Sequence, residues 1–201
     1  MSGRTDLFST MFAPGAHLAA KKKKQTHVVK LQPVGKLHLP SGRLVLGSAY
    51  DFFPVTRTAP AGVFPVEASL VTMSSDESRL AAVRIVFSRE PVVTWEIADG
   101  EFGGAPGFTA PDAVYIDAQL IPALQVYIEG SDSPVEWYYD PPKTRGKTWQ
   151  VACFSPDDDQ PETCVLFGTN SYDDDGPYIS YWGLDAKGAP AMFVTDLNLV
   201  A

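Results

Sequence analysis

Alternation of polar and apolar residues is clearest at 36–39 and 43–46, on either side of Pro40-Ser41-Gly42. Two alternating runs joined by Pro, Ser and Gly predict a β-hairpin. Beyond them, stretches rich in β-branched residues with isolated charges predict a three-stranded meander. These stretches are residues 63–73, 80–88 and 92–98.

The second half of the chain continues the same pattern. Residues 114–116 predict a brief strand, and residues 118–128 predict either a short helix broken near Pro122 or another strand. Loop length and turn residues then predict two further hairpins. They pair residues 149–154 with 163–167, and residues 178–184 with 191–195.

Together these elements amount to about ten strands and little helix, so the predicted class is mainly β. We expect an antiparallel sandwich or a strongly bent sheet built from hairpins. The 16 Gly and 17 Pro agree with many turns. A length of 201 residues suits one domain. We assign it to residues 35–201, after a basic N-terminal extension, residues 1–34, in which Leu7 to Ala20 favours helix.

The net charge of −8 is unevenly distributed. Residues 1–36 hold seven Lys and Arg, including the run Lys21 to Lys24, against Asp6 alone. The rest of the chain is strongly acidic and would repel nucleic-acid phosphates, so nucleic-acid binding by the main domain is disfavoured. An acidic domain of this kind suits a basic protein partner.

Targeting features point to the cytoplasm. No apolar stretch approaches the 18 or so residues that a membrane span needs. The lysine run follows the apolar stretch Leu7 to Ala20, whereas an export signal has the opposite order. If Phe154 faced Thr163, Cys153 would lie opposite Cys164, within reach of a disulfide. A reducing compartment favours two thiols instead.

Histidine is scarce outside the N-terminal region. The three histidines are His17, His27 and His38, so a Ser-His-Asp or Cys-His apparatus would depend on His38. His38 alternates with leucines on a predicted strand, which suits a solvent-facing residue. Two cysteines eleven residues apart are too few for a zinc site. The sequence therefore favours a protein without catalytic activity.

Aspartates supply the remaining candidate chemistry. Two acidic triplets, Asp157 to Asp159 and Asp173 to Asp175, fall in predicted turns. Clustered carboxylates suit Ca²⁺ or Mg²⁺, with Asp112, Asp117, Asp173 and Asp175 as candidate ligands. The helix-loop-helix calcium pattern fails, because its last position is Trp182 rather than Glu. The alternative is solvated turns in which Asp caps its own backbone, with no cofactor.

Aromatic residues gather in the proline-framed segment 134–142, which contains Trp137, Tyr138 and Tyr139. This composition is typical of a recognition surface for a protein or a sugar. The alternative is a loop whose rings fold back into the core. Tyr172 beside the second triplet and Trp182 on a late strand complete the candidate binding residues. The pair Tyr181-Trp182 is expected to lie half in the core and half at its rim.

A series of short motifs follows in one order: Ser41-Gly42-Arg43, Pro60-Ala61-Gly62-Val63-Phe64-Pro65-Val66, Trp95-Glu96-Ile97-Ala98, Tyr115-Ile116-Asp117-Ala118, Asp175-Gly176, Tyr181-Trp182-Gly183-Leu184-Asp185 and Val194-Thr195-Asp196. Their order and spacing resemble a bacterial family, the domain of unknown function 4241, over about residues 35–197. The chain departs from the family's pattern at Ser171-Tyr172-Asp173-Asp174, where the family has a glycine-tryptophan turn. The resemblance implies a fold unit and no established activity.

Three functions are compatible with these observations. The first is a non-catalytic cytoplasmic domain, immunity-like or antitoxin-like, whose acidic face binds a basic protein. The second is a metal-dependent hydrolase or a sugar-binding protein that uses the clustered aspartates. The third is an assembly subunit that docks through its N-terminal arm, for example onto another copy of itself in a homo-oligomer.

Overall fold

The computed structural model describes residues 2–19, 26–47, 52–74, 77–101, 112–130, 149–155, 164–169 and 178–200. Strands dominate this part of the chain, and two α-helices and one 3₁₀ turn accompany them. The elements are α1 (Ser2–Met11), β1 (His17–Ala19), β2 (Thr26–Leu39), β3 (Leu44–Gly47), β4 (Phe52–Pro54), β5 (Gly62–Ser74), β6 (Glu77–Val86), β7 (Thr94–Ile97), β8 (Asp112–Asp117), η1 (Ala118–Leu120), α2 (Ile121–Gly130), β9 (Trp149–Phe154), β10 (Cys164–Thr169), β11 (Ile179–Leu184) and β12 (Pro190–Asp196).

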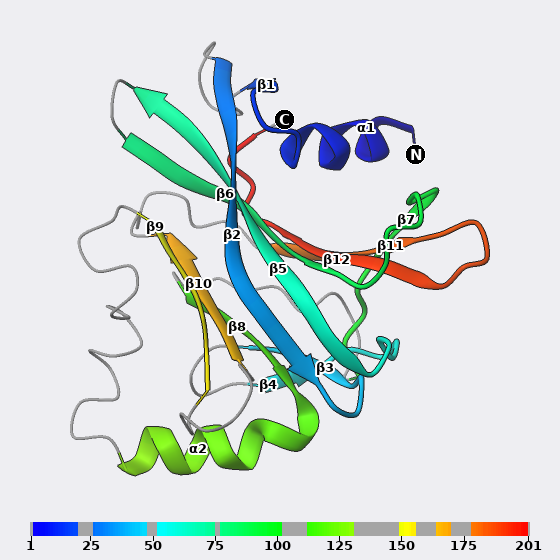
Figure 1. Cartoon of the computed structure of the whole chain (residues 1–201), viewed down its shortest axis with the longest axis vertical. Helices are drawn as coiled ribbons and strands as arrows, with labels where there is room; N and C mark the ends of the chain where they lie inside the picture. The colour runs from blue at the N-terminus through cyan, green and yellow to red at the C-terminus, as the bar shows by residue number, and fades with distance from the viewer. Residues whose placement is uncertain are drawn as a thin grey trace.

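The strands form two antiparallel sheets (Figure 1). One has seven strands in the order β1-β2-β5-β6-β12-β11-β7, and the other has five in the order β4-β3-β8-β10-β9. One sheet is strongly curled. The predicted class, mainly β and antiparallel with few helices, is confirmed.

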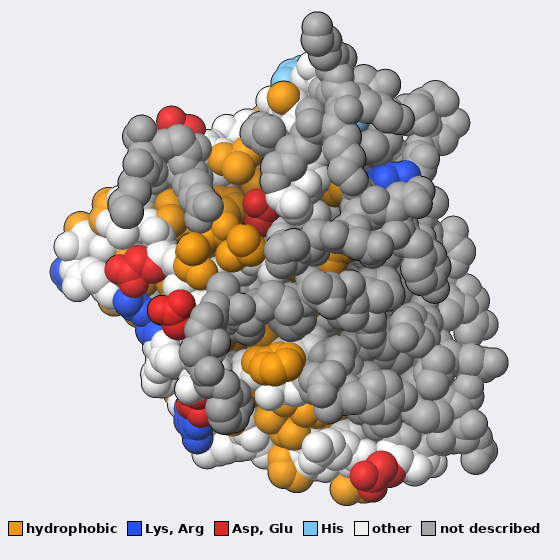
Figure 2. Space-filling view, turned by 180° about the vertical axis from the view of Figure 1, so that it is seen from behind, with side chains coloured by type: hydrophobic (Ala, Val, Ile, Leu, Met, Phe, Trp, Pro, Cys, Tyr) orange, Lys and Arg blue, Asp and Glu red, His pale blue; other side chains and the backbone are white. Residues whose placement is uncertain are grey.

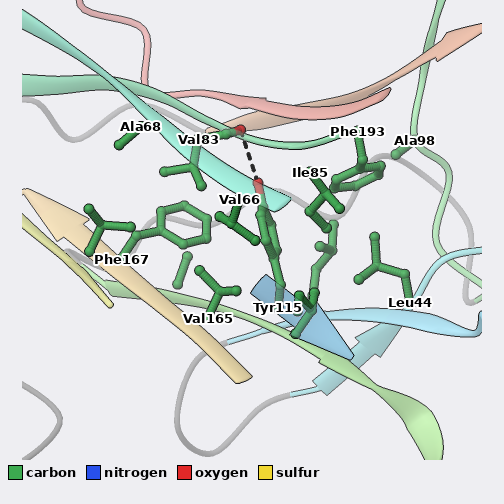
Figure 3. Close-up of a cluster of buried hydrophobic side chains, with 14 of the residues drawn as sticks. Leu44, Val66, Ala68, Val83, Ile85, Ala98, Tyr115, Val165, Phe167 and Phe193 are labelled. Atoms are coloured by element: carbon green, nitrogen blue, oxygen red, sulfur yellow. Dashed lines mark hydrogen bonds between the residues drawn. The ribbon is translucent and has the colours of Figure 1, made fainter. Parts of the chain in front are cut away.

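The main core lies between the two sheets. It takes apolar side chains from alternate positions of the long strands, such as Leu37 and Leu39 on β2 and Val83 and Ile85 on β6. Figure 3 shows side chains from both sheets meeting there, with Tyr115 at the centre. Period-two alternation makes each strand of the sandwich present one face to this core.

A helix covers the outer face of each sheet. Phe8, Met11 and Phe12 of the N-terminal segment are buried on the outside of the seven-stranded sheet. Leu124 of α2 is buried on the outside of the five-stranded sheet. The boundary predicted between residues 34 and 35 falls inside β2, which runs from Thr26 to Leu39. Lys21 to Lys24 lie outside the described residues.

The hairpin predicted over residues 36–46 is wrong, although both of its strands exist. Leu37 on β2 pairs with Phe64 on β5, whereas Val45 on β3 pairs with Ile116 on β8. Residues 40–43 therefore carry the chain from one sheet to the other. A turn within a hairpin and a crossing between sheets use the same Pro, Ser and Gly chemistry, so the local pattern did not separate them.

Pairing also differs from the predicted meander. β5 and β6 pair as predicted, but β7 pairs with β11 at the far edge of the sheet. Residues 118–128 form the helical alternative, with η1 leading into α2. The late hairpin is confirmed by the pairing of β11 with β12.

The two cysteines do not face each other. β9 and β10 pair as predicted, but Cys164 lies opposite Phe154 and Cys153 opposite Val165. This register differs by one residue from the predicted one, so Cys153 points into the main core and Cys164 toward the α2 side. Both are buried thiols, and burial raises the pKa of Cys164 well above its usual value.

Three buried hydroxyl groups join the sheets across the core. Tyr115 on β8 donates to Thr195 Oγ1 on β12 at 2.5 Å, and Thr195 Oγ1 lies 2.6 Å from Ser180 Oγ on β11. Figure 3 marks the longer bond, 3.4 Å, from Tyr115 to the Val83 carbonyl. Burial raises the pKa of the Tyr115 hydroxyl far above its usual range, and the bond to Thr195 offsets only part of that rise. The group therefore stays a neutral donor.

We expect Tyr115→Phe to lower the free energy of unfolding by about 1–2 kcal/mol, because a buried hydrogen bond between the sheets is lost. Urea unfolding measures this change. In a double-mutant cycle, Tyr115→Phe should lower the free energy of unfolding less in the Thr195→Val background than in the wild-type protein, because the bond is already absent there. Equal costs in both backgrounds would show that the pair does not couple the sheets.

Candidate functional site

The crossing between the sheets is organised by the buried carboxylate of Asp117. Its Oδ2 accepts from the Ser41 backbone N–H at 2.9 Å, and its Oδ1 accepts from Ser41 Oγ at 2.6 Å. Oδ1 also accepts from the Gln119 N–H at 2.9 Å, so Asp117 is the N-cap of η1. One side chain thus joins the crossing to the start of the helix that follows β8.

The residues next to Ser41 fit closely around this point. Gly42 has φ +70, and a Cβ there would lie 2.1 Å from the Ala59 carbonyl oxygen. The Gly42 carbonyl accepts from the Ala59 N–H at 2.8 Å, and the Arg43 carbonyl accepts from the Ala118 N–H at 2.9 Å. Only glycine suits this backbone conformation and this close approach.

Asp112 and Asp117 lie too far apart to ligate one metal ion together. They are the first and last residues of β8, and five residues of strand span about 17 Å. Asp117 is fully buried and accepts three hydrogen bonds, which is a structural role. Among the described side chains, no three His, Cys, Asp or Glu come close enough to hold a metal ion. The other predicted ligands, Asp173 and Asp175, lie outside the described residues.

The opposite end of the five-stranded sheet is where several connections begin or end. Gly168 lies opposite Asp112, and Thr169 lies opposite Trp149. Gly47, the last residue of β3, lies opposite Val114. Because β3 and β10 both run antiparallel to β8, both strands end near the start of β8. Four connections therefore start or finish at this end, which we call the Thr169 end. They are residues 48–51, 102–111, 131–148 and 170–177.

Most of the predicted binding residues fall in these four connections, outside the described part of the chain. Together the connections hold seven aromatic residues and seven Asp or Glu against three Lys or Arg. Asp173 follows Thr169 by four residues, and Tyr139 precedes Trp149 by ten. The predicted residues among them are Trp137, Tyr138, Tyr139, Tyr172, Asp173, Asp174 and Asp175.

The other acidic triplet belongs to the opposite end of β10. Asp157 to Asp159 also lie outside the described residues, between Ser155 and Cys164. Cys164 pairs with Ile116, beside Asp117. The six residues of β10 separate the attachment points of the two triplets by about 17 Å.

Trp182 is buried rather than half at the rim. It is 1% exposed in the main core, and its ring contacts those of Phe87 and Phe193 at 6.0 and 4.7 Å. It lies on β11, whose inward positions face the five-stranded sheet. The expectation for the Tyr181-Trp182 pair came from residue composition alone. Composition does not show which face of the sheet each ring occupies, because that depends on the register of β11.

The described residues are only weakly acidic, with 12 Asp and Glu against 9 Lys and Arg. On the face in Figure 2, acidic and basic side chains lie next to each other along one margin. Two exposed ion pairs of this kind are Arg57 with Glu96 at 2.5 Å and Arg43 with Glu101 at 3.0 Å. Half of the 24 Asp and Glu lie in segments outside the described residues. The acidic surplus of the domain is therefore concentrated in those segments.

Asp117 was predicted as a metal ligand, and its structural role was not predicted. The signal was present, because Asp directly before a helix-compatible stretch is an N-cap pattern. The contact with Ser41 carried no such signal, since 76 residues separate the two.

Within the described ranges, no helix is both long and apolar enough to cross a membrane.

Residues 37–102 match the family model described as Protein of unknown function (DUF4241). The match confirms the predicted resemblance over that segment, which includes Ser41-Gly42-Arg43 and Trp95. No curated protein and no solved structure gives a significant match. The family description adds no activity, so a functional assignment depends on the molecule itself.

Asp117→Asn should lower the free energy of unfolding by about 2 kcal/mol, because an amide has one acceptor oxygen where the carboxylate has two. Asp185→Asn is the matched control. Asp185 accepts from the Lys187 and Ala189 N–H groups at 2.8 and 2.9 Å, but in an exposed turn. That loss should stay below about 1 kcal/mol. Equal losses of unfolding free energy in Asp117→Asn and Asp185→Asn, measured in urea, would show that the buried carboxylate contributes no more to stability than the exposed one.

Proposed function

We propose that this protein is a non-catalytic binding domain, immunity-like or antitoxin-like, that holds a basic protein partner at the Thr169 end of the five-stranded sheet. The carrying observation is the register that places Thr169 beside Trp149 and Gly168 beside Asp112. It joins the acidic connection 170–177 and the aromatic connection 131–148 to neighbouring strand ends.

The rigid part of the fold suits such a role. Connections on a packed sandwich can carry recognition residues while the strands keep their ends in place. The strand ends at Asp112, Trp149 and Thr169 are fixed by ladder pairing on β10. The fixed ends reduce the ordering cost that a partner must meet on binding.

The composition of the connections defines the partner's chemistry. Asp173, Asp174 and Asp175 place three carboxylates within seven residues of Thr169. Aromatic rings beside carboxylates favour lysine and arginine side chains through charge attraction and cation–π contact. The partner we propose is therefore a protein with a basic surface, met in the cytoplasm.

The docking-arm alternative has less support. Phe8, Met11 and Phe12 are buried on the protein's own sheet. Residues 2–11 would have to leave that sheet before they could bind a neighbouring subunit.

The two acidic triplets provide a matched test. A partner is first captured from native lysate by the wild-type protein, and its affinity is then measured by calorimetry. Asp173, Asp174 and Asp175 changed together to Asn should weaken binding at least tenfold, with a smaller effect at high salt. Asp157, Asp158 and Asp159 changed to Asn remove the same charge at the other end of β10 and should change affinity less than threefold.

Equal weakening by both triple variants would reduce the interaction to net charge and contradict a localised site. Unchanged affinity in both would contradict the acidic site altogether. Circular dichroism on each variant checks that the sandwich remains folded.

A further inference from the structure

A second feature involves the N-terminal helix and the edge of the seven-stranded sheet. The ring of Phe8 on α1 packs against the rings of Trp95 on β7 and Tyr181 on β11, with ring centroids 4.5 and 5.1 Å apart. Figure 1 shows α1 lying over this sheet with the N-terminus toward β7. One aromatic side chain thus joins the helix to the edge strand.

The ring of Trp95 rests in a socket made by a glycine. Gly183 pairs with Trp95, and a Cβ at Gly183 would lie 2.9 Å from the indole ring. The same Cβ would lie 3.0 Å from Cγ2 of Val92. Trp95 therefore lies between the backbone of β11 and the ring of Phe8, and its side chain remains partly exposed.

Although part of the Trp95 side chain is exposed, its indole nitrogen is covered. The indole N–H of Trp95 is buried and has no hydrogen-bond partner among the described residues. A buried donor without an acceptor disfavours the closed state relative to a state in which water reaches it.

The two ends of α1 are held very differently. At its C-terminal end, the Ser69 hydroxyl donates to the Met11 carbonyl, and the Arg84 guanidinium lies 4.2 Å from the Phe12 ring centre. Gly15 donates to the Val29 carbonyl at 2.9 Å just beyond. Ahead of Met11, Phe8 is the one fully buried side chain among those the structure describes.

The helix has little stability of its own. Six of its ten residues are Ser, Gly, Thr or Asp, which are weak helix formers. Its first turn holds no acidic residue and its last turn no basic one. Helices shorter than about 12 residues are marginal without tertiary contacts. The N-terminal turns of α1 therefore depend on the contacts of buried Phe8 and partly buried Leu7.

We propose that α1 is a strap, hinged near Met11, whose Phe8 end opens from β7 and β11 while the sandwich stays folded. Opening gives water access to the buried indole N–H of Trp95 and uncovers the ring of Tyr181 on the sheet edge. This surface lies on the other sheet from the Thr169 end, so the proposal does not depend on the proposed function.

Hydrogen exchange of the indole N–H groups tests the strap in the full-length protein. Trp182 is the internal control, because its indole N–H is also buried without a described partner but lies in the main core. With ¹⁵N-labelled tryptophan, Trp95→Phe and Trp182→Phe assign the two signals. We expect Trp95 to exchange at least tenfold faster than Trp182, with a much smaller urea dependence.

Two variants separate the strap from general loosening. Phe8→Ala should raise the exchange rate of Trp95 at least tenfold and leave Trp182 within threefold of wild type. Phe64→Ala removes an aromatic contact with Phe87 instead, and should leave Trp95 unchanged relative to global stability. Exchange of Trp95 and Trp182 at one rate with one urea slope would overturn the proposal, since only global unfolding would then expose the indole N–H of Trp95.

Discussion

The arrangement of both sheets depends on the four residues that cross between them and on the carboxylate that holds them. Residues 40–43 lead from the end of β2 to the start of β3, and Asp117 binds Ser41 there through two hydrogen bonds. Because Leu44 pairs with Asp117, the same carboxylate sits where β3 joins β8. The register of the five-stranded sheet and its place under the other sheet are set at this point.

This constraint separates an end whose polar groups are used within the fold from the Thr169 end, where we propose that the partner binds. At the Asp117 end, the polar groups of Ser41, Asp117 and Gln119 are used within the fold. The Thr169 end, one strand length away, carries connections rich in aromatic and acidic residues. Tyr115 stands between them and ties the sheets together through Thr195.

Much of this architecture could be predicted from the sequence, but its pairing could not. Stretches rich in β-branched residues correctly predicted β5 and β6, because such side chains favour strands whatever the neighbouring strand is. The hairpin error at Pro40 to Gly42 arose because turn residues do not indicate which sheet the next strand joins. A shift of one residue moved Cys153 and Cys164 to opposite faces. The contact of Trp95 with Gly183 was equally unpredictable, since 88 positions of chain separate a ring from the space it fills.

A binding site at the Thr169 end is tested by hydrogen–deuterium exchange mass spectrometry on the protein with and without its captured partner. We expect protection in peptides that cover residues 112–114, the start of β9 and residues 169–177. We expect no change in peptides that cover 155–164 or the crossing at 40–43. Protection confined to residues 155–164 or to α2 would contradict a binding site at the Thr169 end.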